Sequence, residues 1–292
     1  MRILLTGVTG YLGSNLAAEL ITKGHELIGL KRHTSSISRI EKILSDLQLH
    51  NLEDIDLAKI FTQYGKVDVV IHTATNYGRN NESIINVINA NMLFPLQLLD
   101  LATHHNVSTF INADTSLDKM LNIYALSKSQ FTDWGRYLSE KEKISFINLK
   151  IEHFYGPGDD ESKFIAHVVK TCMLNKLELN LTSGEQLRDF IYIDDLLSAF
   201  MIFLDKKEGF GNGFFEFDVG SGTAVPIKSV VEIAHRLIGS KTKLNFGVLP
   251  YRVGEAMLCQ ADITNLESMG WKCFYNIETG LQKIIKHEKE LL

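Results

Sequence analysis

Tyr124 and Lys128 lie four residues apart, in the segment Tyr124-Ala125-Leu126-Ser127-Lys128. In a helix this spacing places both side chains on one face, about one turn apart. A phenol is a poor base at neutral pH, because its ordinary pKa is about 10. A neighbouring ammonium group favours the phenolate and lowers that pKa. The pair can therefore exchange a proton with a substrate oxygen while hydride moves at the adjacent carbon, which is oxidoreductase chemistry.

A hydroxyl donor that polarises a carbonyl would complete this chemistry. Thr115 and Ser116 follow a predicted strand at residues 109–112. In open α/β sheets, ligands bind beyond the carboxyl ends of the strands, so both hydroxyls are suitably placed. We predict Thr115 as the catalytic hydroxyl and Ser116 as the alternative. A helix cap or turn is the non-catalytic interpretation of either residue.

Three glycines, Gly7, Gly10 and Gly13, lie in the segment TGVTGYLG between the first predicted strand and the first predicted helix. Glycine at this place permits a tight turn, a close approach of the backbone to a pyrophosphate, and close packing of the helix on the strand. The helix N-terminus then offers free N–H groups to the phosphates. The predicted dinucleotide-binding loop comprises Gly7, Thr9, Gly10, Tyr11, Leu12 and Gly13.

The second predicted strand ends at Leu30 and continues into Lys31 and Arg32, with no carboxylate at its end. Enzymes that use NAD usually place Asp or Glu here to bind the ribose 2′-hydroxyl. Lys31 and Arg32 can instead pair with a 2′-phosphate. We therefore predict NADPH as the cofactor in preference to NAD, the alternative being a solvated basic turn.

The elements that must position these residues alternate along the first half of the chain. Strands are predicted at 2–5, 26–30, 67–72, 109–112 and 144–151, and helices at 15–23 and 123–141. Such alternation predicts βαβ units and a Rossmann-like, doubly wound parallel sheet. We expect a dinucleotide-binding domain over residues 1–155, to which some later segments return. A smaller α/β region over 156–292 would mainly bind substrate.

Composition excludes several classes of protein. The chain has 292 residues, 45% hydrophobic and 22% charged, with a formal net charge of -5. The chain has no surplus of basic residues, which binding to nucleic acid would favour. We find no apolar run in the sequence that predicts a membrane span. The cysteines Cys172, Cys259 and Cys273 show no CxxC spacing, so we predict neither a disulfide framework nor a metal site. The start MRILLTG is no signal peptide, and we expect a cytoplasmic enzyme.

These motifs together resemble the extended short-chain dehydrogenase/reductases, which act mainly on nucleotide sugars. Besides the TGxxGxxG loop and YxxxK, the segments HTAT (72–75), RDFIYIDD (188–195), RVGE (252–255) and GW (270–271) are similar to family motifs. The segments HTATNYGRNNE, DTSLDKMLNIYALSK, IEHFYGPGDDESKF and SGEQLRDFIYIDDLLSAF resemble one branch, the CDP-paratose and CDP-abequose synthases. Within that branch the stretches YGRNNE, DTSL and EHFYG are more similar to the paratose synthases. That branch reduces the 4-keto group of a CDP-3,6-dideoxyhexose with NADPH, in bacterial O-antigen and lipopolysaccharide biosynthesis.

The resemblance implies further site residues. Thr115, Tyr124 and Lys128 would be catalytic, and Arg188 and Arg252 would bind the diphosphate. Further cofactor contacts would be Thr73, Ala74, Thr75 and Asn91, beside Tyr124 and Lys128 themselves. The remaining substrate contacts would be Tyr77, Arg79, Ser116, His153, Lys163, Phe164 and Glu255. Three departures from the family pattern stand out. Only nine positions separate Thr115 from Tyr124, His153 replaces the usual asparagine, and the end of the second strand lacks the family's commoner acidic residue.

Three activities remain to be distinguished. A 4,6-dehydratase needs an added acid and base after the catalytic hydroxyl, where this chain has Ser116 and Leu117. A 4-epimerase retains NAD, whereas Lys31 and Arg32 favour a reductase that consumes NADPH. A non-catalytic dinucleotide sensor would not need the Tyr124–Lys128 pair. We therefore predict a 4-ketoreductase for a nucleotide-activated deoxysugar, assembled as a homodimer through the Tyr124 helix and its neighbour, as in the family.

Overall fold

The computed structural model describes residues 1–252 and 254–290 and contains two compact units. Unit 1 comprises residues 1–150 and 203–217, and unit 2 comprises residues 151–202 and 218–292. The chain thus leaves unit 1 at the end of one strand and later returns to it for a short segment. The predicted domain boundary, between residues 155 and 156, lies a few residues after residue 150, where the chain first leaves unit 1.

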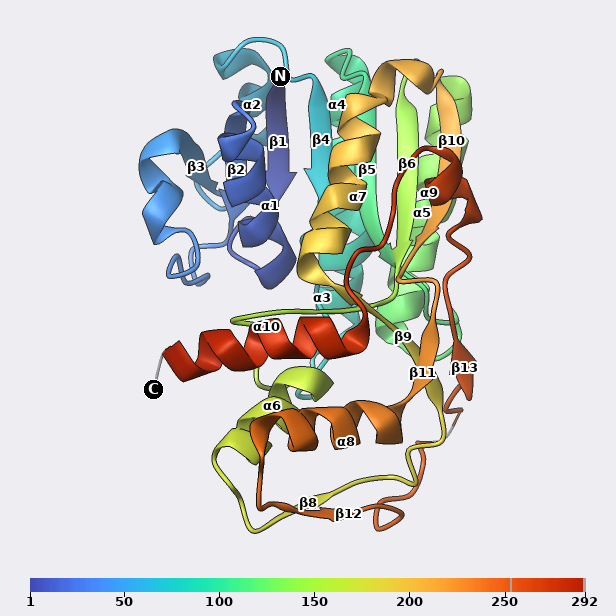
Figure 1. The fold of residues 1–292 in the computed structure, drawn as a ribbon. Coiled ribbons are helices and arrows are strands. Elements are labelled where there is room, and N and C mark those ends of the chain that lie inside the picture. Colours follow the sequence, from blue (N-terminus) through green and yellow to red (C-terminus); the bar gives the residue numbers. More distant parts are fainter. Residues whose placement is uncertain (253, 291–292) are drawn as a thin grey trace. The chain divides into compact units, whose positions relative to one another are not determined.

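Unit 1 is built on a seven-stranded sheet with the order β10-β6-β5-β4-β1-β2-β3 (Figure 1). The ladders that join β1 to β2, β1 to β4, β2 to β3 and β4 to β5 are all parallel. This confirms the predicted Rossmann-like fold class. The strands are β1 (Arg2–Thr6), β2 (Glu26–Lys31), β3 (Leu47–Asn51), β4 (Val69–His72), β5 (Thr109–Thr115), β6 (Ser145–Ile151) and β10 (Gly213–Val219), whose last two residues belong to unit 2.

Helices cover both faces of this sheet. The shared core of α2, α4 and α5 contains a buried aromatic cluster of Phe110, Phe131 and Phe146, each at most 1% exposed. Helix α1 packs on β1 and β2 from the opposite face (Figure 1). The elements are α1 (Tyr11–Thr22), η1 (Glu41–Asp46), α2 (Leu57–Gln63), α3 (Ile84–Ile88), the π-helical η2 (Asn89–Leu93), α4 (Phe94–His104), α5 (Ile123–Lys141) and η3 (Lys207–Gly209).

Unit 2 is a smaller α/β unit. Strand β9 pairs with β7 and β13 in parallel and with β11 in an antiparallel ladder, and β8 pairs with β12. Helices α6 and α8 pack together, and α8 contacts α10. The elements are β7 (His153–Tyr155), α6 (Phe164–Met173), β8 (Glu178–Asn180), β9 (Leu187–Tyr192), α7 (Ile193–Asp205, ending in unit 1), β11 (Ala224–Pro226), α8 (Ile227–Ile238), β12 (Lys243–Asn245), β13 (Leu258–Cys259), α9 (Thr264–Ser268) and α10 (Ile277–Glu290).

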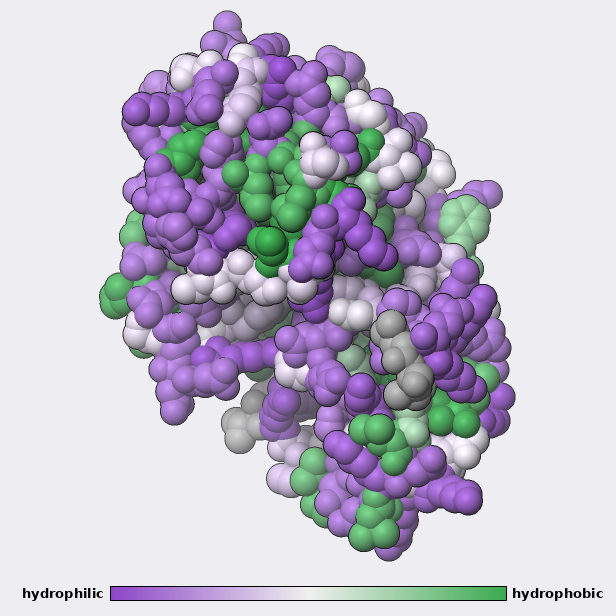
Figure 2. Space-filling view, turned by 90° about the vertical axis from the view of Figure 1, so that its left-hand side faces the viewer, coloured by the Kyte–Doolittle hydropathy of each residue, from purple (hydrophilic) through white to green (hydrophobic). Residues whose placement is uncertain are grey.

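One helical stretch differs from the sequence expectation. Residues 84–104, which span α3, η2 and α4, form a stretch of 21 residues that is long and apolar enough to cross a membrane by length and composition alone. Within unit 1, α4, the last part of this stretch, packs against α2 and α5. The face drawn in Figure 2 is mostly hydrophilic, with hydrophobic side chains gathered in a patch in its upper half.

Candidate active site

The glycine-rich loop connects β1 to α1 and is packed too tightly for larger residues. Gly7 has a φ of +69°, and a Cβ there would lie 2.7 Å from the backbone N of Ala74. A Cβ on Gly13 would lie 2.1 Å from the carbonyl oxygen of Gly7. Gly10 is the N-cap of α1, and no side-chain hydrogen bond caps this end. The N–H groups of the first turn therefore suit a pyrophosphate, and the loop fits a dinucleotide.

The end of β4 is fastened to the end of β1 beside this loop. The hydroxyl of Thr6 accepts hydrogen bonds from the backbone N–H groups of Thr73 and Ala74, both at 3.2 Å. Thr73 returns a hydrogen bond from its own hydroxyl to the Thr6 carbonyl at 2.7 Å. His72 is 1% exposed and shares a 2.8 Å hydrogen bond with the Thr6 hydroxyl. Two predicted cofactor residues, Thr73 and Ala74, thus adjoin the glycine loop.

Asn91 lies in η2 and is 2% exposed. Its amide donates to the carbonyl oxygen of Asn76 at 2.8 Å and to the Ser127 hydroxyl at 3.0 Å. Its oxygen accepts from the N–H of Asn76 at 2.7 Å and from the Thr75 hydroxyl at 3.3 Å. Protein groups thus fill all four hydrogen-bonding positions of the amide. Asn91 therefore joins the segment that follows β4 to α5.

Tyr124 and Lys128 lie on the first turns of α5, whose N-cap Asn122 accepts a hydrogen bond from the N–H of Ala125. Lys128 is 5% exposed, and its Nζ donates to the carbonyl oxygen of Ala113 at 2.6 Å. Burial lowers the pKa of Lys128, and the charge of Asp114 opposes that shift. The structure thus brings the predicted acid/base pair to the end of β5.

The phenol of Tyr124 is mostly shielded from solvent. The expected lowering of its pKa by Lys128 is not what the structure shows: burial raises the pKa of Tyr124 well above the ordinary value, and Tyr77 adds to this. The Thr115 side chain and the charge of Arg79 act in the opposite direction and lower that pKa. Thr115 therefore meets Tyr124 despite the short stretch between them. At neutral pH the phenol carries its proton, as a proton donor requires.

Tyr77 and Arg79 lie in the segment between β4 and α3, beside the phenol. The rings of Tyr77 and Tyr124 are 5.2 Å apart and inclined at 39°. The guanidinium carbon of Arg79 lies 5.0 Å from the centre of the Tyr77 ring. Both predicted substrate residues of this segment thus adjoin the predicted acid/base pair.

The carboxylates of Glu53 and Asp54 both bind His33, in the basic turn after β2. Lys31 pairs with Asn51 in the β2–β3 ladder, and its Nζ donates to the carbonyl oxygen of Arg32 at 3.2 Å. Asp54 lies nearby and binds the His33 ring at 2.8 Å. Hydrogen bonds from Asn51 and His33 lower the pKa of Asp54, and Lys31 lowers it further. Lys31 and Arg32 therefore lie at the end of β2 within a mixed set of charges.

In unit 2, Arg188 and Glu255 form an ion pair, and the Arg188 side chain is 8% exposed. Arg188 also donates to the carbonyl oxygen of Leu187 at 2.9 Å. The N–H of Glu255 donates to the carbonyl oxygen of Arg252 at 3.1 Å, so Arg252 lies next to the pair. Three predicted substrate residues thus come together, with the Arg252 side chain exposed.

His153 lies on β7, opposite Phe190 of β9. Its ring meets Phe190 edge to face at 5.7 Å, and Phe164 stacks on Phe190 at 6.5 Å. Nδ1 of His153 lies 3.5 Å from Oε2 of Glu152, whose side chain is 4% exposed. Lys163, the N-cap of α6, lies over the ring of Phe154 at 5.0 Å. His153 and Phe164 therefore share an aromatic cluster, and Lys163 immediately precedes it.

Known proteins support the resemblance. The model of the NAD-dependent epimerase/dehydratase family matches residues 3–220. The chain belongs to the NAD-dependent epimerase/dehydratase family. Over 97% of both chains it is 34% identical to a CDP-abequose synthase of Salmonella muenchen, and 30% identical to one of Salmonella typhimurium. The predicted membership of the extended short-chain dehydrogenase/reductases is thereby confirmed.

Solved structures of family members share the fold. A UDP-glucose 4-epimerase of Thermotoga maritima superposes with a TM-score of 0.88 at 19% identity, covering 100% of this chain and 99% of that one. A UDP-glucuronic acid 4-epimerase of Bacillus cereus, solved with UDP-glucuronic acid and NAD, gives 0.88 at 22% identity and covers all of both chains. At this identity the likeness establishes the fold and not the reaction.

Sequence reasoning missed several neighbours of these residues. Asp114 precedes Thr115 and binds three donors, Glu152 lies beside His153, and Arg39 lies 5.8 Å above the ring of Tyr11. Only the position of Asp114 at a strand end offered a signal.

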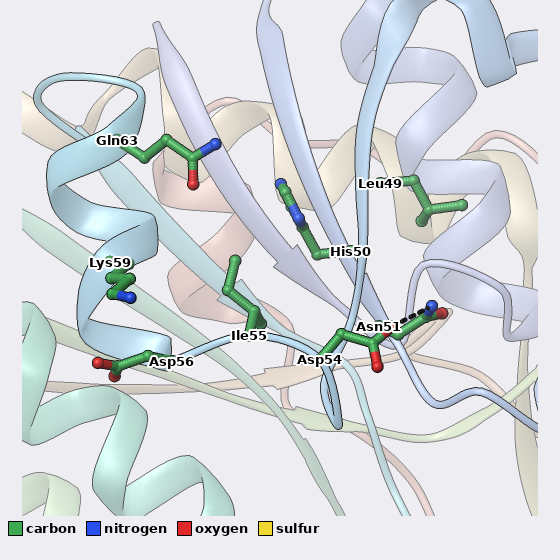
Figure 3. A pocket seen from close by; sticks show the side chains of 8 residues that line it. All are labelled: Leu49, His50, Asn51, Asp54, Ile55, Asp56, Lys59 and Gln63. Carbon is green, nitrogen blue, oxygen red and sulfur yellow. Dashed lines mark hydrogen bonds between the residues drawn. The ribbon is translucent and has the colours of Figure 1, made fainter.

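A cavity of about 420 Å³ opens between β3 and α2 (Figure 3). Its lining includes His50, Lys59 and Gln63 and none of the predicted site residues.

Proposed function

We propose that this protein reduces the 4-keto group of a CDP-4-keto-3,6-dideoxyglucose-type sugar with NADPH. The observation that carries the proposal is the group of Tyr124, Lys128 and Thr115 at the carboxyl end of β5. A relative that is 34% identical over nearly the whole chain and named CDP-abequose synthase supports the choice of sugar. This assigns the protein to bacterial polysaccharide biosynthesis.

In the proposed reaction, Thr115 donates a hydrogen bond to the carbonyl oxygen at C4 and polarises it. Tyr124 transfers its phenolic proton to the same oxygen, because its raised pKa keeps it protonated at neutral pH. The ammonium of Lys128 stabilises the phenolate that remains. Bound NADPH supplies hydride to C4, and solvent restores the proton on Tyr124.

We assign the cofactor to unit 1 and the nucleotide of the substrate mainly to unit 2. The glycine loop and the Thr6 network support the first assignment. For the second, Arg188 and Arg252 offer guanidinium groups, which bind diphosphates in a bidentate manner. Lys31 and Arg32 support NADPH over NAD, because each can pair with the 2′-phosphate.

We also propose a homodimer formed through α3 to α5 of unit 1. Ile84, Ile85, Leu93 and Leu126 are between 37% and 64% exposed on these adjacent helices. Exposed apolar side chains gathered on packed helices favour a partner that covers them. Sedimentation of the purified protein would measure the assembly.

A direct assay tests the proposed reaction. The protein is mixed with NADPH and CDP-4-keto-3,6-dideoxyglucose, and the absorbance of NADPH is followed. We expect consumption that depends on the sugar and is slower with NADH. Interconversion of 4-epimers without added cofactor would indicate the epimerase instead. Binding of NADPH without turnover of any 4-keto nucleotide sugar would indicate a sensor.

A further inference from the structure

Lys128 is a buried cation that needs a negative partner. Taking an ammonium out of water favours its neutral form, and burial lowers the pKa of Lys128 accordingly. Its hydrogen bond to the Ala113 carbonyl supplies a dipole and no full charge. The titratable groups that act on it are His72 at the end of β4, Tyr124 one turn earlier on α5, and Asp114 at the end of β5. Of these, only Asp114 carries a negative charge at neutral pH.

The carboxylate of Asp114 joins three elements of unit 1. Oδ1 accepts a hydrogen bond from the N–H of Thr115 at 2.8 Å, within β5. Oδ2 accepts from the Thr132 hydroxyl of α5 at 2.8 Å and from the amide of Asn148 of β6 at 3.0 Å. Three donors from three elements are therefore aimed at one carboxylate, and together they fix its position.

Thr132 shares a helix face with the proposed acid/base pair. Tyr124, Lys128 and Thr132 are spaced four residues apart on α5, so they lie in one row along the helix. The bond from Thr132 to Asp114 fastens that row to β5, one residue before Thr115. A shift of α5 along β5 would therefore break this bond and misplace Tyr124 against Thr115.

We propose that Asp114 is a positioning residue for the Tyr124–Lys128 pair, tethering α5 to the end of β5 and placing a carboxylate one residue from the Ala113 carbonyl that binds Lys128. The proposal rests on the function proposed above for the pair. Asp114 itself acts through Lys128, Thr132 and Thr115 and exchanges no proton with substrate.

Glu216 provides a matched control. It accepts a hydrogen bond from the same Asn148 amide at 3.0 Å, and so carries the same charge into the same network. It lies exposed on the edge strand β10 and binds neither Thr132 nor Thr115 among the described residues. Asp114→Asn and Glu216→Gln therefore remove equivalent charges from the two sides of Asn148.

We expect Asp114→Asn to lower kcat by about 10- to 100-fold, because it weakens acid/base catalysis without removing the catalytic groups. KM for both substrates should change by less than about threefold, because the cofactor loop and unit 2 are untouched. Glu216→Gln should keep both constants. A loss of kcat in Glu216→Gln equal to that in Asp114→Asn would overturn the proposal, and so would unchanged kcat in Asp114→Asn.

A second measurement needs no substrate and so separates this proposal from the proposed reaction. In protein labelled with 13C-lysine, the Cε shift of Lys128 is assigned by loss of its signal in Lys128→Arg and followed against pH. The pKa of Lys128 should be lower in Asp114→Asn than in the wild type or Glu216→Gln. An unchanged pKa would contradict the charge role even if the wild type proved inactive on the proposed sugar.

Thr132→Val keeps the proposal testable if Asp114→Asn does not fold. It replaces a hydroxyl with a methyl group of similar size and leaves the charge of Asp114 in place. Loss of one donor should lower kcat about fivefold, which corresponds to a hydrogen bond of about 1 kcal/mol. Wild-type kcat in Thr132→Val would contradict the tether.

Discussion

The Nζ of Lys128 donates a 2.6 Å hydrogen bond to the carbonyl oxygen of Ala113, so the proposed catalytic helix is joined directly to the end of β5. Lys128 is 5% exposed and Ala113 is 8% exposed. A buried charge-assisted hydrogen bond of this kind fixes position as well as charge. It sets the ammonium one turn from Tyr124 and two residues from Thr115 along the neighbouring strand.

Tyr124→Phe should lower kcat by about 100-fold or more while leaving the affinity for NADPH nearly unchanged. The phenol oxygen is the proposed proton donor, and general acid catalysis contributes factors of about 10² to 10⁴. Steady-state kinetics and NADPH fluorescence measure the two effects. Tyr137→Phe removes a phenol oxygen from an exposed position on the same helix and should keep wild-type kcat. Full activity in Tyr124→Phe would exclude the assigned role.

Thr115→Val should lower kcat about 100-fold, because it removes the donor that polarises the carbonyl. Ser116→Ala should act mainly on KM for the sugar, since it is Thr115 that acts on the pKa of the Tyr124 phenol. Comparison of kcat and KM in the two variants decides which hydroxyl serves the reaction. If Ser116→Ala alone abolished kcat, the two assignments would have to be exchanged.

Arg32→Ala should raise KM for NADPH about tenfold and leave KM for NADH unchanged. The expected loss corresponds to ~1.4 kcal/mol, at the lower end for a hydrogen bond to a charged group, because Arg32 is exposed. NADH measured on the same variant is the internal control, because it lacks the 2′-phosphate. Equal losses for both cofactors would argue against a 2′-phosphate contact.

His72 should make the fold sensitive to acid. Burial lowers the pKa of His72 well below its ordinary value, and the charge of Lys128 lowers it further. Below pH 6.5 the unfolded chain therefore binds a proton that the folded chain does not. The free energy of unfolding therefore decreases as the pH is lowered. The slope from this group alone is about 1.4 kcal/mol per pH unit from 6.5 down to its folded pKa.

Urea unfolding of the wild type and His72→Gln between pH 7 and 5 measures this effect as the difference between the two slopes. His104→Gln is the comparison, because a hydrogen bond to the Asp100 carbonyl raises the pKa of that exposed imidazole. The His104→Gln substitution should not reduce the slope of the free energy of unfolding against pH between pH 7 and 5. Parallel curves for the wild type and His72→Gln would show that His72 is not held neutral.

Gly135→Ala should destabilise unit 1 by about 1 to 2 kcal/mol. A Cβ on Gly135 would lie 2.3 Å from the ring of Phe146, which stacks between Phe110 and Phe214 and cannot withdraw. Overpacking of this kind costs up to about 3 kcal/mol, and the gain in helix propensity offsets about 1. Urea unfolding tests this against Gly209→Ala, where nothing lies within 4 Å of the added Cβ. Equal stability of both variants would contradict the packing argument.

Local pattern predicted the strongest elements of unit 1. The helix expected over 123–141 is α5 with the same limits, and the strands at 2–5, 26–30 and 109–112 are the cores of β1, β2 and β5. Strand β3 and helix α2 were not predicted. Strand β3 is a sheet edge of mixed polarity and α2 has only seven residues, so neither gives a clear hydrophobic period.

The sequence by itself determined the fold class, the family and the proposed catalytic residues, because each follows from local spacing: three glycines at a strand-to-helix turn, and a tyrosine and a lysine one helical turn apart. Only the tertiary structure decided which groups surround them. Asp114 meets Thr132 and Asn148 across 18 and 34 positions of sequence, and Asn91 meets Ser127 across 36. No local pattern encodes such contacts, because the parallel sheet and its crossover helices create them when distant strand ends align at one edge.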